Sequence, residues 1–150
     1  MKAIEPVLGG IHLFVGLGAL AGGYLGISDP TLASMGANAE DMLQNAPFDT
    51  FLIPGIFLFA VIGLGNLGAG ITAFRHWRYQ GYAGGAMGGI LMAWIVIQCY
   101  MLWEINALHA IFFAIGTVQG LLALVLAFRH DLLPAQLLRR VFKGNELPPL

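Results

Sequence analysis

Residues 81–128 read GYAGGAMGGILMAWIVIQCYMLWEINALHAIFFAIGTVQGLLALVLAF, which is two long apolar runs with almost nothing between them. The runs, residues 81–103 and 107–128, each reach the ~20 residues that a helix needs to cross ~30 Å of hydrocarbon. Only Glu104, Ile105 and Asn106 separate them, so the two helices must be adjacent and antiparallel. The stretch predicts a tight transmembrane hairpin.

Two further apolar runs, residues 4–27 and 50–74, precede this hairpin. The break between residues 74 and 81 is short, which makes the second and third helices neighbours as well. The chain of 150 residues is 58% hydrophobic and 10% charged, against about 25% charged in an ordinary soluble domain. We therefore expect an all-α integral membrane four-helix bundle over residues 1–128.

The basic residues predict the orientation of the bundle. They occur only at the N-terminus, in the break between the second and third runs, and in the tail after the fourth: Lys2, Arg75, Arg78, Arg129, Arg139, Arg140 and Lys143. Lys and Arg in short loops stay on the cytoplasmic side, so both termini should be cytoplasmic. The net charge of −1 gives no argument for a nucleic-acid partner.

Two segments outside the spans have an amphipathic pattern. In the first outer loop, residues 28–49, a short helix would place Leu32, Met35, Met42 and Leu43 on one face. Residues 129–150 form a basic amphipathic tail expected on the cytoplasmic surface. The basic side chains at that surface are expected to bind lipid headgroups: Arg75, Arg78, Arg129, Arg139, Arg140 and Lys143.

Glycines at four-residue spacing are the expected packing positions. Apolar area gives helices in a bilayer no net drive to associate, so close approach depends on small residues. The stripes selected are Gly18 and Gly22, Gly85 and Gly89, and Gly116 and Gly120. They predict helix packing within one chain, or self-association through a stripe that remains uncovered.

Polar residues inside the spans mark hydrogen bonds between helices or a functional site. Depth counted at about 1.5 Å per residue puts His12 and Asn66 in the inner leaflet and Gln119 near the midplane. An outer cluster, the candidate ligand site, comprises Trp94, Gln98, Trp103, Glu104, Asn106 and His109. Glu104 and His109 are expected either to form a carboxylate–imidazole pair or to lie in an exposed turn.

Cofactor chemistry is constrained by a small set of residues. The lone Cys99 excludes an internal disulfide, and no histidine–carboxylate spacing within a span suits a metal. His12 and His109 fall in opposite leaflets, so haem is restricted to His76 and His130 at the inner surface. A quinone would use the aromatic and polar residues of the outer cluster. No cofactor is therefore expected, with haem and quinone left open.

Several motifs carry a resemblance to a known group. They are Asp29-Pro30, the run APFDTFLIPG at residues 46–55, Gly63, Gly65 and Asn66, and WIVIQ at residues 94–98. On these the chain resembles small, mostly uncharacterised bacterial four-helix inner-membrane proteins, across most of residues 8–128. The arrangement is also broadly similar to DoxX-type proteins, which accompany membrane redox systems. The resemblance implies the four-helix architecture and carries over no catalytic residue.

The function expected first is a non-catalytic subunit or accessory factor of a larger membrane complex, with lipids and other membrane subunits, or a second copy of the chain, as partners. An oligomeric transporter or channel is the second hypothesis. A quinone-linked membrane redox component is the third.

Overall fold

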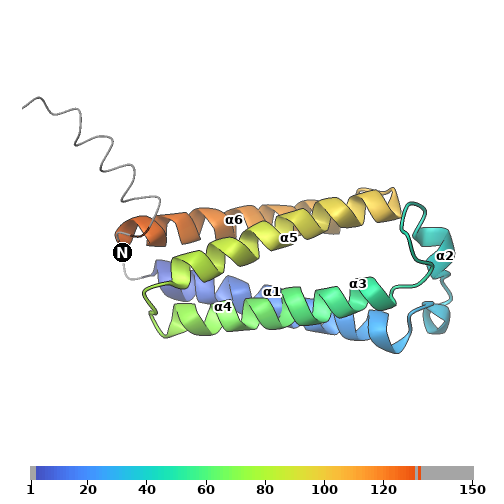
Figure 1. Cartoon of the computed structure of the whole chain (residues 1–150), viewed down its shortest axis with the longest axis horizontal. Coiled ribbons are helices and arrows are strands. Elements are labelled where there is room, and N and C mark those ends of the chain that lie inside the picture. Colours follow the sequence, from blue (N-terminus) through green and yellow to red (C-terminus); the bar gives the residue numbers. More distant parts are fainter. Residues whose placement is uncertain (1–2, 131, 133–150) are drawn as a thin grey trace, which may run out of the picture.

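Four long helical segments run side by side in the computed structural model, which describes residues 3–130 and 132 (Figure 1). They are α1 (Ile4–Ser28), a continuous segment made of α3 (Leu52–Phe57), η2 (Leu58–Leu64) and α4 (Gly65–Phe74), then α5 (Gln80–Leu102) and α6 (Ala107–Arg129). All four are long and apolar enough to cross a membrane. The predicted class, all-helical with four spans, is confirmed, and each helix begins and ends within two residues of its predicted span.

The two ends of the bundle differ. The start of α1, the 75–79 connection and the end of α6 lie together at one end, called here the Glu5 end (Figure 1). The 29–51 segment and the 103–106 turn lie at the other, called here the loop end.

The bundle consists of two closely packed helix pairs. α1 packs along α3, η2 and α4, while α5 packs along α6, and each pair holds together more extensively than the two pairs do with each other. A Cβ atom added at Gly23 of α1 would lie 2.5 Å from Phe59 N, and one added at Gly88 of α5 would lie 2.8 Å from Gly116 O. Within each pair the backbones therefore touch where only glycine fits.

The contacts of α5 fall on a different glycine row from the predicted one. A Cβ at Gly81 would lie 2.9 Å from Ala123 O of α6, whereas a Cβ at Gly89 would meet nothing within 4 Å and one at Gly85 only the Ala123 Cβ at 3.7 Å. The prediction of Gly89 as a packing contact within the chain is wrong. Gly81 and Gly88 face α6 because they lie two helical turns apart on the same side of α5.

The other predicted glycines have mixed surroundings. Gly116 is in close contact with Gly88, and the Gly120 nitrogen lies 2.9 Å from a Cβ built at Gly88. A Cβ at Gly22 would meet only the Leu58 Cδ2 atom, at 3.2 Å, and one at Gly18 would meet nothing within 4 Å. Gly18 thus leaves room beside α1 instead of closing a helix contact.

The second span begins as expected and then changes its helical type. Pro54 lies in the first turn of α3, where its missing N–H removes no helical hydrogen bond. From Leu58 to Leu64 the helix widens to a π-type turn, with hydrogen bonds from residue i+5 to residue i, before α4 resumes the α-helix. No residue pattern in the sequence signals this wider turn.

The first outer loop does not form the predicted single amphipathic helix. It contains two short turns, η1 (Ala33–Met35) and α2 (Ala39–Met42), separated at Gly36, which adopts φ +70°. Met35 is exposed, whereas Leu43 is buried against the bundle. Leu43 and Met35 therefore cannot share one face, because the left-handed residue between the turns redirects the chain.

The loop instead covers the end of the bundle. The Asn45 N–H donates to Met101 O at 3.1 Å, and Phe51 N–H donates to Pro30 O at 2.8 Å, which tie the segment to α5 and to its own start. Ala39 and Leu43 join the core cluster that contains Met101. The loop thus extends the apolar core beyond the helix ends.

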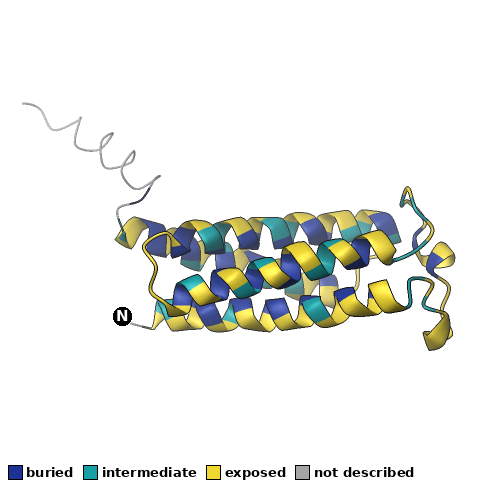
Figure 2. Ribbon diagram, turned by 60° about the horizontal axis from the view of Figure 1, so that its bottom comes forward, coloured by how far each residue is buried: buried dark blue, intermediate teal, exposed yellow. Residues whose placement is uncertain are grey.

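Exposed residues cover the outward faces of the four helices (Figure 2), and many of them are large and apolar. Only about a third of the most apolar stretch of each span is buried within the bundle. Large side chains such as Phe14, Leu64, Val96 and Leu121 are exposed. A bundle with this surface needs an apolar surrounding, as a bilayer provides.

Candidate ligand site between the helix pairs

A pocket of about 330 Å³ lies between the two helix pairs, in the half of the bundle nearer the loop end. It exists because α1 contributes Gly18 and Gly22 to its wall, and these positions carry no side chain to fill the space. The rest of the wall is mainly aliphatic and aromatic, including Leu58, Leu91 and Phe112. Small-molecule sites typically have this size and character, with a few placed polar groups.

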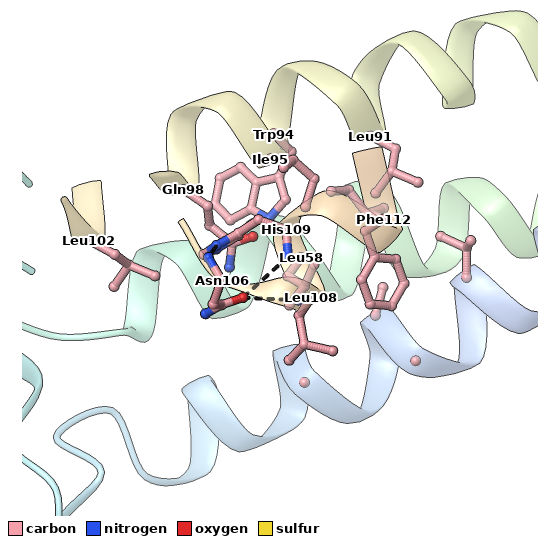
Figure 3. A pocket seen from close by; sticks show the side chains of 15 residues that line it. Leu58, Leu91, Trp94, Ile95, Gln98, Leu102, Asn106, Leu108, His109 and Phe112 are labelled. Atoms are coloured by element: carbon pink, nitrogen blue, oxygen red, sulfur yellow. Dashed lines mark hydrogen bonds between the residues drawn. The ribbon is translucent and has the colours of Figure 1, made fainter. Parts of the chain in front are cut away.

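The polar groups of the pocket are concentrated at one end. Figure 3 shows Trp94, Gln98, Asn106 and His109 gathered there, with Leu91 and Phe112 further along the pocket. Trp94 and Gln98 come from α5, Asn106 caps α6 and His109 lies in the first turn of α6. The short α5–α6 turn brings these residues together.

The hydrogen bonds of Asn106 fix the state of His109. The Asn106 side-chain oxygen accepts from the Leu108 N–H at 3.1 Å and the His109 N–H at 3.2 Å, and His109 Nδ1 accepts from the Asn106 backbone N–H at 3.2 Å. This reciprocal capping box uses a histidine where Glu or Gln is usual. Because Nδ1 is an acceptor, the neutral ring carries its proton on Nε2, which is a hydrogen-bond donor.

Trp94 supplies a second donor. Its ring stacks on Phe57 of α3, with ring centroids 4.6 Å apart, and the residue is 6% exposed. Its Nε1–H is buried with no hydrogen-bond partner among the residues that the structure describes. An indole N–H can only donate, so this group calls for a ligand with an acceptor atom.

The predicted outer cluster is thus only partly assembled. Trp94, Gln98, Asn106 and His109 line one pocket, whereas Trp103 is 70% exposed and Glu104 is also exposed, outside the pocket. Of the two arrangements expected for Glu104 and His109, the carboxylate–imidazole pair is not formed, since His109 Nδ1 accepts from the Asn106 N–H and Glu104 lies in an exposed turn. Trp103 adopts φ +50°, which ends α5 and turns the chain outward before Glu104.

A second polar cluster lies deeper in the bundle, toward the Glu5 end, and its composition was only partly foreseen. His12 of α1, Asn66 of α4 and Gln119 of α6 are each 0% exposed and converge at one point. Asn66 Oδ1 lies 2.7 Å from His12 Nδ1 and accepts from Gln119 Nε2 at 2.9 Å. The predicted hydrogen bonds between helices are present for Asn66 and Gln119; Gln98 lines the pocket instead.

The depth estimated from residue positions places Gln119 away from His12. This estimate uses backbone positions only and leaves out the length of the glutamine side chain. The usable signal was the presence of one uncharged polar residue on each of three spans. Polar groups in hydrocarbon seek each other, so three such residues at heights within one side-chain length are expected to meet.

A third cluster closes the Glu5 end. The Glu5 carboxylate binds His76 Nδ1 with one oxygen, while the other accepts from Gln80 Nε2 at 3.1 Å and lies 3.7 Å from His130 Nε2. One carboxylate of α1 therefore contacts residues at the ends of the other three spans. His76 and His130 were expected only as surface residues and haem candidates, and here both contact Glu5.

The predicted headgroup residues divide in two sets. Arg75, Arg78 and Arg129 are exposed at the Glu5 end, and the Arg78 guanidinium lies 5.8 Å from the centroid of the Tyr79 ring. Arg139, Arg140 and Lys143 lie outside the described residues, as does most of the predicted amphipathic tail.

Comparison of the chain with protein-family models, curated proteins and solved structures gives no match. The class of the protein therefore rests on its own architecture. Four candidate membrane-spanning helices with an apolar outer surface indicate a multi-pass membrane protein.

Proposed function

We propose that this chain is an accessory protein of a bacterial inner-membrane system that binds a quinone-type molecule between its two helix pairs. The buried, unpaired Trp94 Nε1–H in the wall of an apolar pocket is the observation that carries this proposal. A lipid-soluble ligand with a carbonyl oxygen would satisfy that donor and fill the apolar remainder of the pocket.

The donor set supports a ligand that accepts hydrogen bonds. The residues that carry these donors, Trp94, His109 and Gln98, all line the same end of the pocket. A quinone ring is planar and apolar with carbonyl oxygens at opposite edges, which suits an aromatic wall and a cluster of donors. Phe57 stacked on Trp94 keeps the indole plane fixed for such a ring.

The orientation proposed is the one predicted from the charges, with the Glu5 end in the cytoplasm. Arg75, Arg78 and Arg129 lie at this end, where they would meet anionic headgroups, and Glu40, Asp41 and Glu104 lie at the loop end. In this orientation the polar end of the pocket lies in the outer half of the bilayer.

The test is binding of a short-chain benzoquinone to the purified full-length protein in lipid nanodiscs. Trp94→Phe removes the N–H together with one ring of the indole and keeps an aromatic ring beside Phe57, so affinity should fall at least about fivefold, the value of one neutral hydrogen bond. Trp103→Phe is the matched control, because Trp103 lies outside the pocket and its substitution should leave affinity unchanged. Equal affinity of the Trp94→Phe variant and the wild type would refute the proposal.

A further inference from the structure

His12 has one nitrogen engaged in hydrogen bonding and one that is not. Asn66 Nδ2 donates to Ile62 O at 2.9 Å, which turns Asn66 Oδ1 toward His12. A carbonyl oxygen only accepts, so the 2.7 Å contact with Asn66 Oδ1 favours a proton on His12 Nδ1, although Gln119 Nε2 also lies 2.9 Å from that nitrogen. Gln119 Nε2 then donates to the same oxygen at 2.9 Å. The remaining nitrogen of His12, Nε2, is a bare lone pair in the neutral ring.

This nitrogen lies at the centre of the bundle without a donor. His12 Nε2 and Gln119 Oε1 are both buried and have no hydrogen-bond partner among the described residues. Nε2 faces α5 at Gly84, where an added Cβ would lie 3.1 Å away. An unsatisfied acceptor in hydrocarbon is costly, and Nε2 is the ring nitrogen of His12 that remains open to a proton.

We propose that His12 Nε2 is a proton-binding site inside the membrane domain, loaded from the Glu5 end of the bundle. The proton from solution forms an N–H bond with the Nε2 lone pair, and the ring becomes a cation without any transfer of electrons. An ionisable side chain buried within a membrane span is typically retained for such a role. The site is separate from the ligand pocket and does not depend on the function proposed for it.

Few other groups can influence this proton. The neighbouring elements present Asn66 and Gly70 of α4, Gly84 of α5 and Gln119 of α6, none of which titrates. On α1 the nearest titratable residue is Glu5, seven positions earlier, or about 10 Å along the helix. The charged ring would therefore be stabilised chiefly by Asn66 Oδ1, which lies 2.7 Å from Nδ1.

The route to the site is indicated by the residues above and below it on α1. Glu5, with its partners His76 and His130, forms a titratable entrance at the bundle end. Leu8 is 0% exposed, and a Cβ at Gly84 would touch both Leu8 Cδ2 and His12 Nε2 at 3.1 Å. Leu8 is thus the side chain that separates the Glu5 cluster from His12.

The first experiment measures the protonation state of His12 in the full-length protein in nanodiscs by ¹⁵N NMR of labelled histidine, from about pH 8 to about pH 4. His12 is assigned by the signal lost in His12→Gln. A triple variant with His76, His109 and His130 each changed to Gln retains His12 alone and serves if His12→Gln does not fold. We expect protonated Nδ1 and bare Nε2 at the alkaline limit, and reversible protonation of Nε2 before unfolding. A ring that stays neutral until the protein unfolds, or one that carries its proton on Nε2 instead of Nδ1 at the alkaline limit, overturns the proposal.

The second experiment tests the direction of loading with a matched pair of cavity variants. Leu8→Ala opens the side of His12 toward Glu5, and Val15→Ala opens the side toward the ligand pocket, since both side chains are almost completely buried. Exchange of the His12 ring proton with solvent should become severalfold faster in Leu8→Ala only. Faster exchange in Val15→Ala alone, or no change in Leu8→Ala, would contradict loading from the Glu5 end.

Discussion

Asn66 is the residue that joins three of the four spans. Its amide nitrogen binds Ile62 O within its own span, and its oxygen receives hydrogen bonds from α1 and α6. The π-type turn that ends at Leu64 directly precedes this position, and wider turns of this kind often occur at functional sites. The proposed proton on His12 Nδ1 depends on the orientation of this one amide.

Loss of this amide should destabilise the bundle. In Asn66→Leu the N–H groups of His12 and Gln119 lose their acceptor, and we expect a cost of about 1–2 kcal/mol, the upper range for hydrogen bonds between membrane helices. Reversible unfolding in mixed micelles measures it. Gln98→Leu is the control, because Gln98 lines the pocket and is not part of the hydrogen-bond network of His12, Asn66 and Gln119. Equal stability of the two variants would show that the network contributes nothing.

The Asp29 carboxylate gives a pH prediction outside the spans. The Ser34 hydroxyl and N–H both donate to Asp29 Oδ2, and the hydroxyl bond is the main reason that the pKa of Asp29 lies below its usual value. A lowered folded-state pKa means that the contribution to stability is present above the unfolded pKa of 3.8 and is lost as the pH falls through the folded value. Ser34→Ala should raise the pKa of Asp29 in an NMR titration, whereas the nearby Ser28→Ala should not.

In each helix pair, the glycines that allow close packing lie on the face of one helix that contacts the other. Along α5, Gly88 faces the α6 backbone while its neighbour Gly89 faces open space. The sequence predicts that α5 packs through glycine but contains two adjacent rows, and nothing in residue identity distinguishes them. The direction is decided by how α6, with Gly116 and Ala123, fits against α5, which is a property of two helices together.

Alanine should therefore destabilise the protein at Gly88 and leave its stability unchanged at Gly89. In Gly88→Ala the new Cβ would lie 2.8 Å from Gly116 O and 2.9 Å from Gly120 N, and backbone atoms cannot yield cheaply, so we expect a loss of about 1–3 kcal/mol. Gly89→Ala meets no atom within 4 Å and should be neutral. Thermal unfolding of the two variants in the same detergent compares them. A larger loss in Gly89→Ala would mean that this face contacts a second chain.

Chain length and hydropathy predict the four spans, because spanning a bilayer requires only length and apolar composition. They do not predict that the four spans pack as two helix pairs. This arrangement leaves a pocket between the pairs, beside Gly18 and Gly22. Four of the six predicted site residues line that pocket because the short α5–α6 turn keeps them close. Interhelical hydrogen bonds are predicted for Asn66 and Gln119, but their meeting with His12 and the contacts of Glu5 are not, because each depends on how distant spans pack.

Orientation in the membrane decides from which side the ligand and the proton arrive. A single cysteine placed at Ala37 in the loop, or at Trp77 in the α4–α5 connection, reports it in a Cys99→Ser background; both positions are exposed and at opposite ends of the bundle. In intact bacterial cells, an impermeant thiol reagent should label Ala37→Cys at once and Trp77→Cys only after the membrane is opened. Labelling of Trp77→Cys in intact cells, with Ala37→Cys protected until lysis, would reverse the orientation and contradict the proposed sides of both sites.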